Sequence, residues 1–177
     1  MKHLTVFALA FVAFADARYM AKIGTLMDCG GISANVTGQF YTDPIPVPGE
    51  GFGAFDFVLS QDLPMDLVLE KMAWKIETGE VIPCLGLAGG FMGSCTIKLC
   101  ESLDQIPDFF CPFFPENLPC NCPFLATSGT VKLNLTFSEE YIMYGPGDYE
   151  QKLRLISEAN PEENLACVDI KYTLINA

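Results

Sequence analysis

The sequence predicts an all-β protein, an antiparallel sheet structure with one face in solvent. Apolar and polar residues alternate with a period of two over several segments, which is typical of half-buried strands. Half of the 177 residues are apolar and 12% are aromatic, which is enough to build a hydrophobic core in a domain of this size. Sheets with one buried and one solvated face are usually antiparallel.

The first segment predicts export rather than a folded element. A short basic start, Met1 to His3, is followed by an apolar run from Leu4 to Phe14 and by Ala15-Asp16-Ala17. This is the pattern of a secretory signal peptide, and the run is too short for a membrane span, which needs about 20 residues. We therefore expect residues 1–17 to be a signal peptide and residues 18–177 to form one domain in the secretory pathway.

Six strands follow from the alternation of apolar and polar residues. In the clearest of them, Val131, Leu133, Leu135 and Phe137 alternate with polar residues. The expected strands span residues 32–40, 55–59, 65–70, 131–137, 149–157 and 166–174.

Two further segments predict connections or sheet edges. Proline stands at every second position from Pro44 to Pro48, and because proline donates no backbone hydrogen bond, this segment is an edge or an extended connector. Residues 49–53 contain three glycines and resemble a phosphate-binding loop only superficially, because no helical pattern follows. We expect a turn there.

The pattern changes between residues 82 and 124, where six of the eight cysteines lie among many prolines. Ser94 is a candidate N-cap for a short helix over residues 95–103. The remainder is expected to be loop held together by disulfides. Four phenylalanines in this loop either cap the core, which we favour, or form an exposed apolar patch: Phe109, Phe110, Phe113 and Phe114.

All eight cysteines follow the expected signal peptide, in an oxidising compartment. An even number there predicts four disulfides, for which counting alone allows about 105 connectivities. Zinc is the alternative, but the only histidine, His3, lies in the signal peptide. We therefore predict disulfides and no metal site.

Charge and composition exclude several functions. The net charge of -12 argues against binding to nucleic acid, which requires clustered Lys and Arg. Without histidine after His3 and without a free thiol, the usual general bases and nucleophiles are missing, so we predict no enzyme, no catalytic residues and no cofactor. Glycosidase chemistry with two carboxylates remains an alternative.

Two sequons fit the predicted strands. Asn35-Val36-Thr37 and Asn134-Leu135-Thr136 both set the asparagine on the polar side of its strand. A glycan must stand in solvent, so Asn35 and Asn134 are predicted glycosylation sites, with at least one occupied.

Several motifs occur in an order that resembles a known family. They are DPIPVPG (43–49), DLVLEK (66–71), IPC (82–84), GSCT (93–96) and LPCNCPF (118–124), with Cys167 in the last strand. Together with all eight cysteines they closely resemble the ganglioside activators, the lysosomal sphingolipid activators of the ML lipid-recognition superfamily. The resemblance covers residues 28–175.

The resemblance implies a disulfide pairing and a fold. The implied pairs are Cys29–Cys167, Cys84–Cys95, Cys100–Cys122 and Cys111–Cys120. The implied fold is an antiparallel β-cup or sandwich with an apolar lipid cavity, one short helix and a disulfide-stapled loop region. Its candidate lining residues are Phe55, Phe57, Leu67, Leu69, Leu133, Leu135 and Phe137.

The family also has apolar rim loops that approach membranes. The corresponding loop here is Tyr141, Ile142, Met143 and Tyr144, followed by a Gly-Pro-Gly turn suited to a mobile lid, although an ordinary strand end is the alternative. The family's rim tryptophan is missing, since the only tryptophan is Trp74. Further rim candidates are Trp74 and the phenylalanines Phe109, Phe110, Phe113 and Phe114.

The resemblance implies a non-enzymatic protein that extracts a glycosphingolipid, such as a ganglioside, from membranes and presents it to the soluble lysosomal β-hexosaminidase. Its implied partners are the lipid, the hexosaminidase and, transiently at acidic pH, a membrane surface, and its location is lysosomal or extracellular. The alternative is a secreted carrier of sterols, fatty acids or other small apolar ligands.

Overall fold

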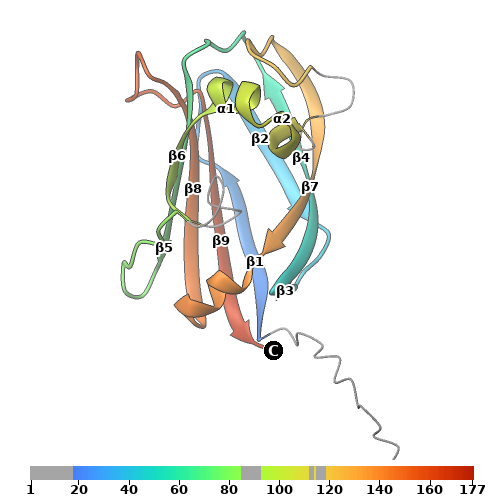
Figure 1. The fold of residues 1–177 in the computed structure, drawn as a ribbon, viewed down its shortest axis with the longest axis vertical. Coiled ribbons are helices and arrows are strands. Elements are labelled where there is room, and N and C mark those ends of the chain that lie inside the picture. Colours follow the sequence, from blue (N-terminus) through green and yellow to red (C-terminus); the bar gives the residue numbers. More distant parts are fainter. Residues whose placement is uncertain (1–17, 85–92, 112–113, 115–118) are drawn as a thin grey trace, which may run out of the picture.

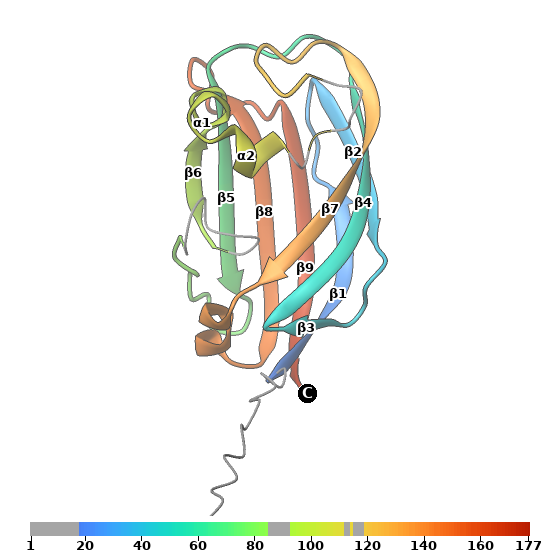
Figure 2. The ribbon, with the colours of Figure 1, turned by 45° about the vertical axis from the view of Figure 1, so that its right-hand side comes forward.

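The computed structural model shows two antiparallel β-sheets that face each other, which confirms the predicted all-β fold (Figures 1 and 2). It describes residues 18–84, 93–111, 114 and 119–177, apart from the side chains of Phe109, Leu133, Asn134 and Leu135. The expected signal peptide, residues 1–17, lies outside the described residues.

The larger sheet has six strands in the order β3-β1-β9-β8-β5-β6. The strands are β1 (Tyr19–Asp28), β3 (Ile45–Val47), β5 (Leu67–Lys75), β6 (Cys95–Lys98), β8 (Gly147–Ser157) and β9 (Ala166–Asn176). The proline-rich segment supplies β3, which pairs only with β1 within this sheet. Its place at the sheet edge agrees with the prediction.

The smaller sheet has three strands in the order β2-β4-β7. They are β2 (Ala34–Phe40), β4 (Gly49–Leu59) and β7 (Thr127–Phe137). The central strand β4 pairs with β7 along its whole length, from Gly49 opposite Phe137 to Leu59 opposite Thr127. The predicted turn at residues 49–53 is therefore wrong, because these residues begin β4.

Close packing explains the glycines that suggested a turn. A side chain at Gly51 would lie 2.5 Å from the side chain of Ile45, which is completely buried. Glycine within a strand often marks such a close approach. Gly51 thus serves the packing of β3 on β4.

Short helices lie at the two ends of the β-sandwich (Figure 2). At one end are α1 (Leu99–Gln105) and α2 (Pro107–Phe110), and at the other are the 3-10 helix η3 (Glu139–Tyr144) and the C-terminus. None of the helices in the described ranges is long and apolar enough to cross a membrane.

The predicted helix over residues 95–103 begins too early. Cys95–Lys98 form β6, in which Cys95 and Ile97 are buried and Thr96 and Lys98 are exposed, so that α1 starts at Leu99. Ser94 is not a helix cap. Its hydroxyl accepts a hydrogen bond from the Ala73 N–H (3.0 Å) and donates one to the Ala73 carbonyl oxygen (3.2 Å). The pairing of β6 with β5 overrides the local helix signal.

The four disulfides join the same cysteines that the resemblance implied. Cys29–Cys167 connects the end of β1 to β9, and Cys84–Cys95 connects the segment after β5 to β6. Cys100–Cys122 and Cys111–Cys120 fasten the loop that leads to β7 onto α1 and α2.

The hydrophobic core is unevenly distributed along the sandwich. The largest cluster fills the end with η3, where Tyr149 stacks on Tyr172 (5.4 Å) and Phe137 meets Tyr141 edge-on (5.7 Å). Two smaller clusters lie at the other end, around Phe110 and around Leu63. The sandwich is therefore densely filled at one end and less so at the other.

Candidate functional site: an apolar pocket at the α1 end

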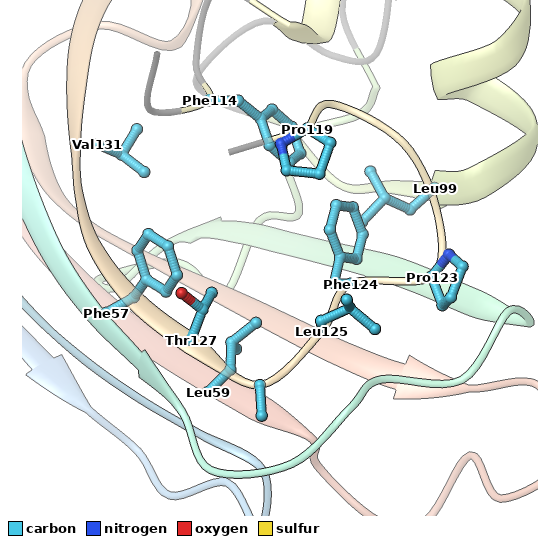
Figure 3. A pocket seen from close by; sticks show the side chains of 11 residues that line it. Phe57, Leu59, Leu99, Phe114, Pro119, Pro123, Phe124, Leu125, Thr127 and Val131 are labelled. Carbon is cyan, nitrogen blue, oxygen red and sulfur yellow. The ribbon is translucent and has the colours of Figure 1, made fainter. Parts of the chain in front are cut away.

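An apolar pocket of about 560 Å³ lies between the smaller sheet and α1 (Figure 3). It falls within the roughly 300–1,000 Å³ typical of small-molecule sites. Strands β4 and β7 form one wall, and α1 and the loop before β7 form the other. Its lining residues are Phe57, Leu59, Leu99, Phe114, Pro119, Pro123, Phe124, Leu125, Ala126, Thr127 and Val131.

The wall on the smaller sheet follows from strand alternation. Phe57 and Leu59 of β4 face the pocket, whereas Asp56 and Val58 are exposed. Because Leu59 pairs with Thr127 on β7, the cross-strand residues Thr127 and Val131 point to the same side. Opposite Phe57 stands Gly129, which has no side chain to fill the space.

The opposite wall is held covalently. Phe114 and Phe124 stack with ring centroids 5.4 Å apart, and Leu99 lies at the start of α1. The bonded pair Cys100–Cys122 ties the residue after Leu99 to the loop that carries Phe124. This wall has no period-two pattern because a disulfide and single hydrogen bonds, such as that from the Leu63 N–H to the Phe124 carbonyl oxygen (2.8 Å), fix it in place of a strand ladder.

The pocket is chemically suited to a hydrocarbon chain. Among the described residues that line it, Thr127 is the one polar residue. A charged or strongly polar group would lose its hydration there without gaining partners, which is costly. An apolar chain would gain about 0.8 kcal/mol for each buried methylene group.

The mouth of the pocket also carries exposed apolar side chains. Leu125 is 60% exposed although it lines the pocket. The lining residues Pro119 and Pro123 are exposed as well. An apolar rim beside an apolar pocket is typical of a site that meets another apolar phase.

Lys71 is a buried cation in the interior near the pocket end. It lies on β5 opposite Leu153 and Cys95, is 7% exposed, and burial lowers its pKa to about 8.

Among the described residues, no cluster of three or more His, Cys, Asp and Glu side chains could hold a metal ion.

Two of the residues named from the sequence line the pocket, namely Phe57 and Phe114. Phe110 is buried in the neighbouring cluster, against which Leu69 packs. Leu67 belongs to the cluster around Leu63. The structure thus brings these five candidates to the same end of the sandwich.

Other lining candidates lie elsewhere. Phe137 is buried in the core of the η3 end, and Phe55 packs edge-on against Phe40 at 5.5 Å. The side chains of Leu133, Leu135 and Phe109, and the whole of Phe113, lie outside the described part of the chain.

The segment named as a rim loop lies in η3, at the opposite end from the pocket (Figures 1 and 2). Tyr141 is buried, Ile142 and Tyr144 are half-buried, and Met143 is 73% exposed. Trp74, near the end of β5, is half-buried and bridges to Val81. The structure does not bring this group to the pocket.

Hydrogen bonds hold η3 against the sheet. The Lys75 ammonium donates to the carbonyl oxygens of Tyr144 (3.1 Å) and Pro146 (2.8 Å). The Tyr149 hydroxyl lies 2.8 Å from the carbonyl oxygens of Tyr144 and Gly145. Burial, helped by the nearby carboxylates of Glu77 and Glu80, raises the pKa of Tyr149 to about 12.

The sequence did not indicate most of the residues that line the pocket, on either wall. The missed residues are Leu59, Leu99, Pro119, Pro123, Phe124, Leu125, Ala126, Thr127 and Val131. Leu59 and Val131 were within reach, because both lie on the apolar faces of predicted strands. The lining residues from the loop before β7 have no periodic sequence pattern that would show whether their side chains point inward.

The fold and pocket define a two-sheet β-protein with one hollow, apolar end. No family model matches the chain, and no curated protein matches it in sequence. In structure it is similar to a Niemann-Pick type C2 protein from Japanese carpenter ant, with 14% identity and a TM-score of 0.49, over 84% of this chain and 97% of that one.

It is also similar to chicken MD-1 in complex with lipid IVa, with 13% identity and a TM-score of 0.46, over 88% of this chain and 96% of that one. At these values the similarities carry no argument about function.

Proposed function

We propose that this protein is a non-enzymatic lipid carrier that holds an apolar tail in the pocket between β4, β7 and α1. The observation that carries the proposal is the apolar cavity of about 560 Å³, in which Thr127 is the one polar side chain of the described lining. Exposing an acyl chain of about 16 carbons to water costs on the order of 12 kcal/mol, so lipids rarely leave a bilayer unaided. An apolar pocket lowers this barrier.

The specific form of the proposal is that the protein extracts a glycosphingolipid, such as a ganglioside, and presents it to a soluble lysosomal hexosaminidase. The motif order and the eight cysteines support this form. The tail would enter the pocket while the sugars remain in water at its mouth, where an enzyme could reach them. Export through the secretory pathway, to the lysosome or the cell exterior, is part of this proposal.

Charge is consistent with action in an acidic compartment. The chain carries 22 acidic and 10 basic residues, so an anionic membrane repels it at neutral pH. Near pH 4.5 an ordinary Glu side chain, with a pKa of about 4.3, is partly neutral. Repulsion is then weaker, and transient contact with the membrane is easier.

The size of the pocket favours a second candidate, a carrier of sterols, fatty acids or other single apolar ligands. A methylene group is similar in size to a water molecule, which occupies about 30 Å³ in the liquid, so 560 Å³ corresponds to roughly 18 methylene groups. This is about one long chain. A two-chain lipid would leave its second chain at the mouth.

Lipid transfer tests the proposal. Full-length protein secreted from a eukaryotic host is mixed at about pH 4.5 with donor vesicles containing a pyrene-labelled ganglioside and with unlabelled acceptor vesicles. We expect transfer that increases with protein concentration. Val131→Trp should abolish transfer by filling the pocket, whereas Ser128→Trp, on the exposed side of the same strand, should leave it unchanged.

Native mass spectrometry and a hydrolysis assay separate the two candidates. A co-purified two-chain glycolipid, with faster ganglioside hydrolysis by added hexosaminidase, supports the activator. A co-purified sterol or fatty acid, without effect on hydrolysis, supports the simple carrier. Absence of both transfer and bound ligand in the wild type would refute both.

A further inference from the structure

The outer face of the smaller sheet carries two exposed apolar side chains. The helices lie at the ends of the sandwich, so that the outward side of β2, β4 and β7 turns to solvent (Figure 2). Along β4 the outward positions are Glu50, Phe52, Ala54, Asp56 and Val58. Phe52 is 51% exposed and Val58 is 53% exposed.

Each of these two residues pairs with the asparagine of a sequon. Val58 pairs with Asn35 on β2, and Phe52 pairs with Asn134 on β7. Directly paired residues have Cβ atoms about 5 Å apart on the same face of a sheet. Asn35 and the sequon residues Thr37 and Thr136 are exposed.

We propose that N-linked glycans on Asn35 and Asn134 cover Val58 and Phe52, so that the outer face of the smaller sheet is a carbohydrate-shielded surface. By strand register, the first sugar of a glycan at Asn35 would come within reach of Val58, and one at Asn134 within reach of Phe52. A pyranose ring has an apolar C–H face that packs on aromatic and aliphatic side chains, as other apolar groups do. The large apolar residues of β4 stand where such a ring would lie.

Strand positions add a second reason. β2 and β7 are the outer strands of the three-stranded sheet, with β4 between them. Outer strands expose backbone donors and acceptors that invite pairing with other chains, and bulky polar groups prevent it. A glycan on β7 would protect the edge of that strand as well as Phe52, whereas on β2 the N–H groups of Ala34 and Val36 already donate to Leu165 and Asp28.

The modification follows from export of the chain, and it is independent of what the pocket binds. In the transfer step, the asparagine Nδ2 attacks the anomeric carbon of a lipid-linked oligosaccharide diphosphate. A C–N bond forms, the C–O bond to the diphosphate breaks with its electrons going to the leaving group, and Nδ2 loses one proton to a base.

Site occupancy and shielding are tested on the full chain secreted from a eukaryotic host. Intact mass before and after enzymatic deglycosylation should show two glycans. Hydroxyl-radical footprinting then measures the oxidation rates of Phe52 and Val58, with the exposed Met143 at the opposite end as the internal reference. Deglycosylating the folded wild type should raise both rates severalfold and leave Met143 unchanged.

Matched substitutions assign each glycan to its partner. Thr136→Ala removes the second sequon and should raise the oxidation rate of Phe52 alone, whereas Thr37→Ala should raise that of Val58 alone. Thr136→Ser and Thr37→Ser retain the sequons and should behave like the wild type. An unoccupied site, or oxidation rates that do not change when the glycan is removed, would overturn the proposal.

Discussion

Lys71 contributes a charge to the protein interior, and its effect on stability depends on pH. Burial lowers its pKa from 10.5 to about 8 in the folded protein. Between these values the unfolded chain binds more protons than the folded one, so the free energy of unfolding rises with pH from about 8. The pKa shift corresponds to a change of roughly 3 kcal/mol in the free energy of unfolding.

We therefore expect a rise in stability between about pH 8 and pH 10 that is absent in Lys71→Met. Above pH 10 the raised pKa of Tyr149 opposes the rise, because the unfolded tyrosine then loses its proton first. Urea unfolding at a series of pH values measures the slope. Lys132→Met, at an exposed position on β7, is the control, and an equal slope in Lys71→Met would contradict the assignment.

Asp66 affects the stability of the fold in the acidic pH range, whereas Lys71 affects it in the alkaline range. Its carboxylate accepts hydrogen bonds from the Ser157 hydroxyl (2.5 Å) and the Ala159 N–H (2.9 Å), and these lower its pKa below 3.8. A depressed pKa stabilises the folded protein above the unfolded value, and this contribution is lost as the pH falls through the folded value. It is thus retained in a mildly acidic compartment.

Asp66→Asn should consequently reduce stability more at pH 5 than at pH 2, because the carboxylate stabilises the fold above its unfolded pKa and this contribution is lost as the pH falls. Thermal unfolding followed by circular dichroism at both pH values measures the difference. The same substitution at the exposed Asp104 of α1 should have little effect at either pH. A loss of stability that is equal at both pH values would mean that the charge of Asp66 does not matter.

At the scale of secondary-structure elements, regular alternation made strands predictable. The apolar positions of β7 follow a strict period of two, and this strand extends the predicted one by four residues, to Thr127. β1 was missed because its pairing with β9 is irregular between Ile23 and Thr25. This shift of register breaks the alternation that would reveal a strand.

The pocket was harder to predict than the sheets. Its strand wall depends on which face of β4 and β7 turns inward, and alternation shows this for Phe57. Its other wall comes from a loop, where long-range contacts place Phe124 and Leu125. These contacts are the Cys100–Cys122 disulfide, the hydrogen bond from the Leu63 N–H to the Phe124 carbonyl oxygen (2.8 Å) and that from the Ala126 N–H to the Asp62 carboxylate (2.7 Å). The resemblance implied a cavity and two sets of rim residues. The set in η3 lies at the opposite end from the described pocket, whereas Phe114 of the other set lines it.

This difference predicts which end contacts membranes. If the pocket takes lipid from a bilayer, its mouth must face the bilayer, so Leu125→Asp should weaken binding to anionic vesicles and slow lipid transfer. Met143→Asp adds the same charge to an exposed apolar residue at the η3 end and should change neither. Flotation of protein with vesicles at acidic pH measures binding. The reverse ranking would assign membrane contact to η3.

At the scale of the whole molecule, the sandwich separates stability from ligand binding. The η3 end contains the dense core of stacked tyrosines, while the α1 end is hollow and relies on disulfides for its outer wall. A cavity lacks packing contacts, so its walls need another source of rigidity. The disulfides differ in what they join, since Cys29–Cys167 connects the ends of two strands of the larger sheet and Cys100–Cys122 connects parts of the pocket wall.

Removing one disulfide at a time should separate the two roles. Cys29–Cys167 closes a loop with a sequence separation of 138, and its removal by paired Cys→Ser substitutions should cost roughly 5 kcal/mol by chain entropy while the folded protein retains lipid transfer. Cys100–Cys122 spans 22 residues, and its removal should cost roughly 3 kcal/mol. This smaller loss of stability should be accompanied by loss of transfer, because Phe124 is then no longer held opposite Phe57.

Chemical denaturation measures stability, and vesicle transfer measures binding under conditions in which each variant is folded. If transfer declined in proportion to stability in both variants, the pocket and the core would form one cooperative unit.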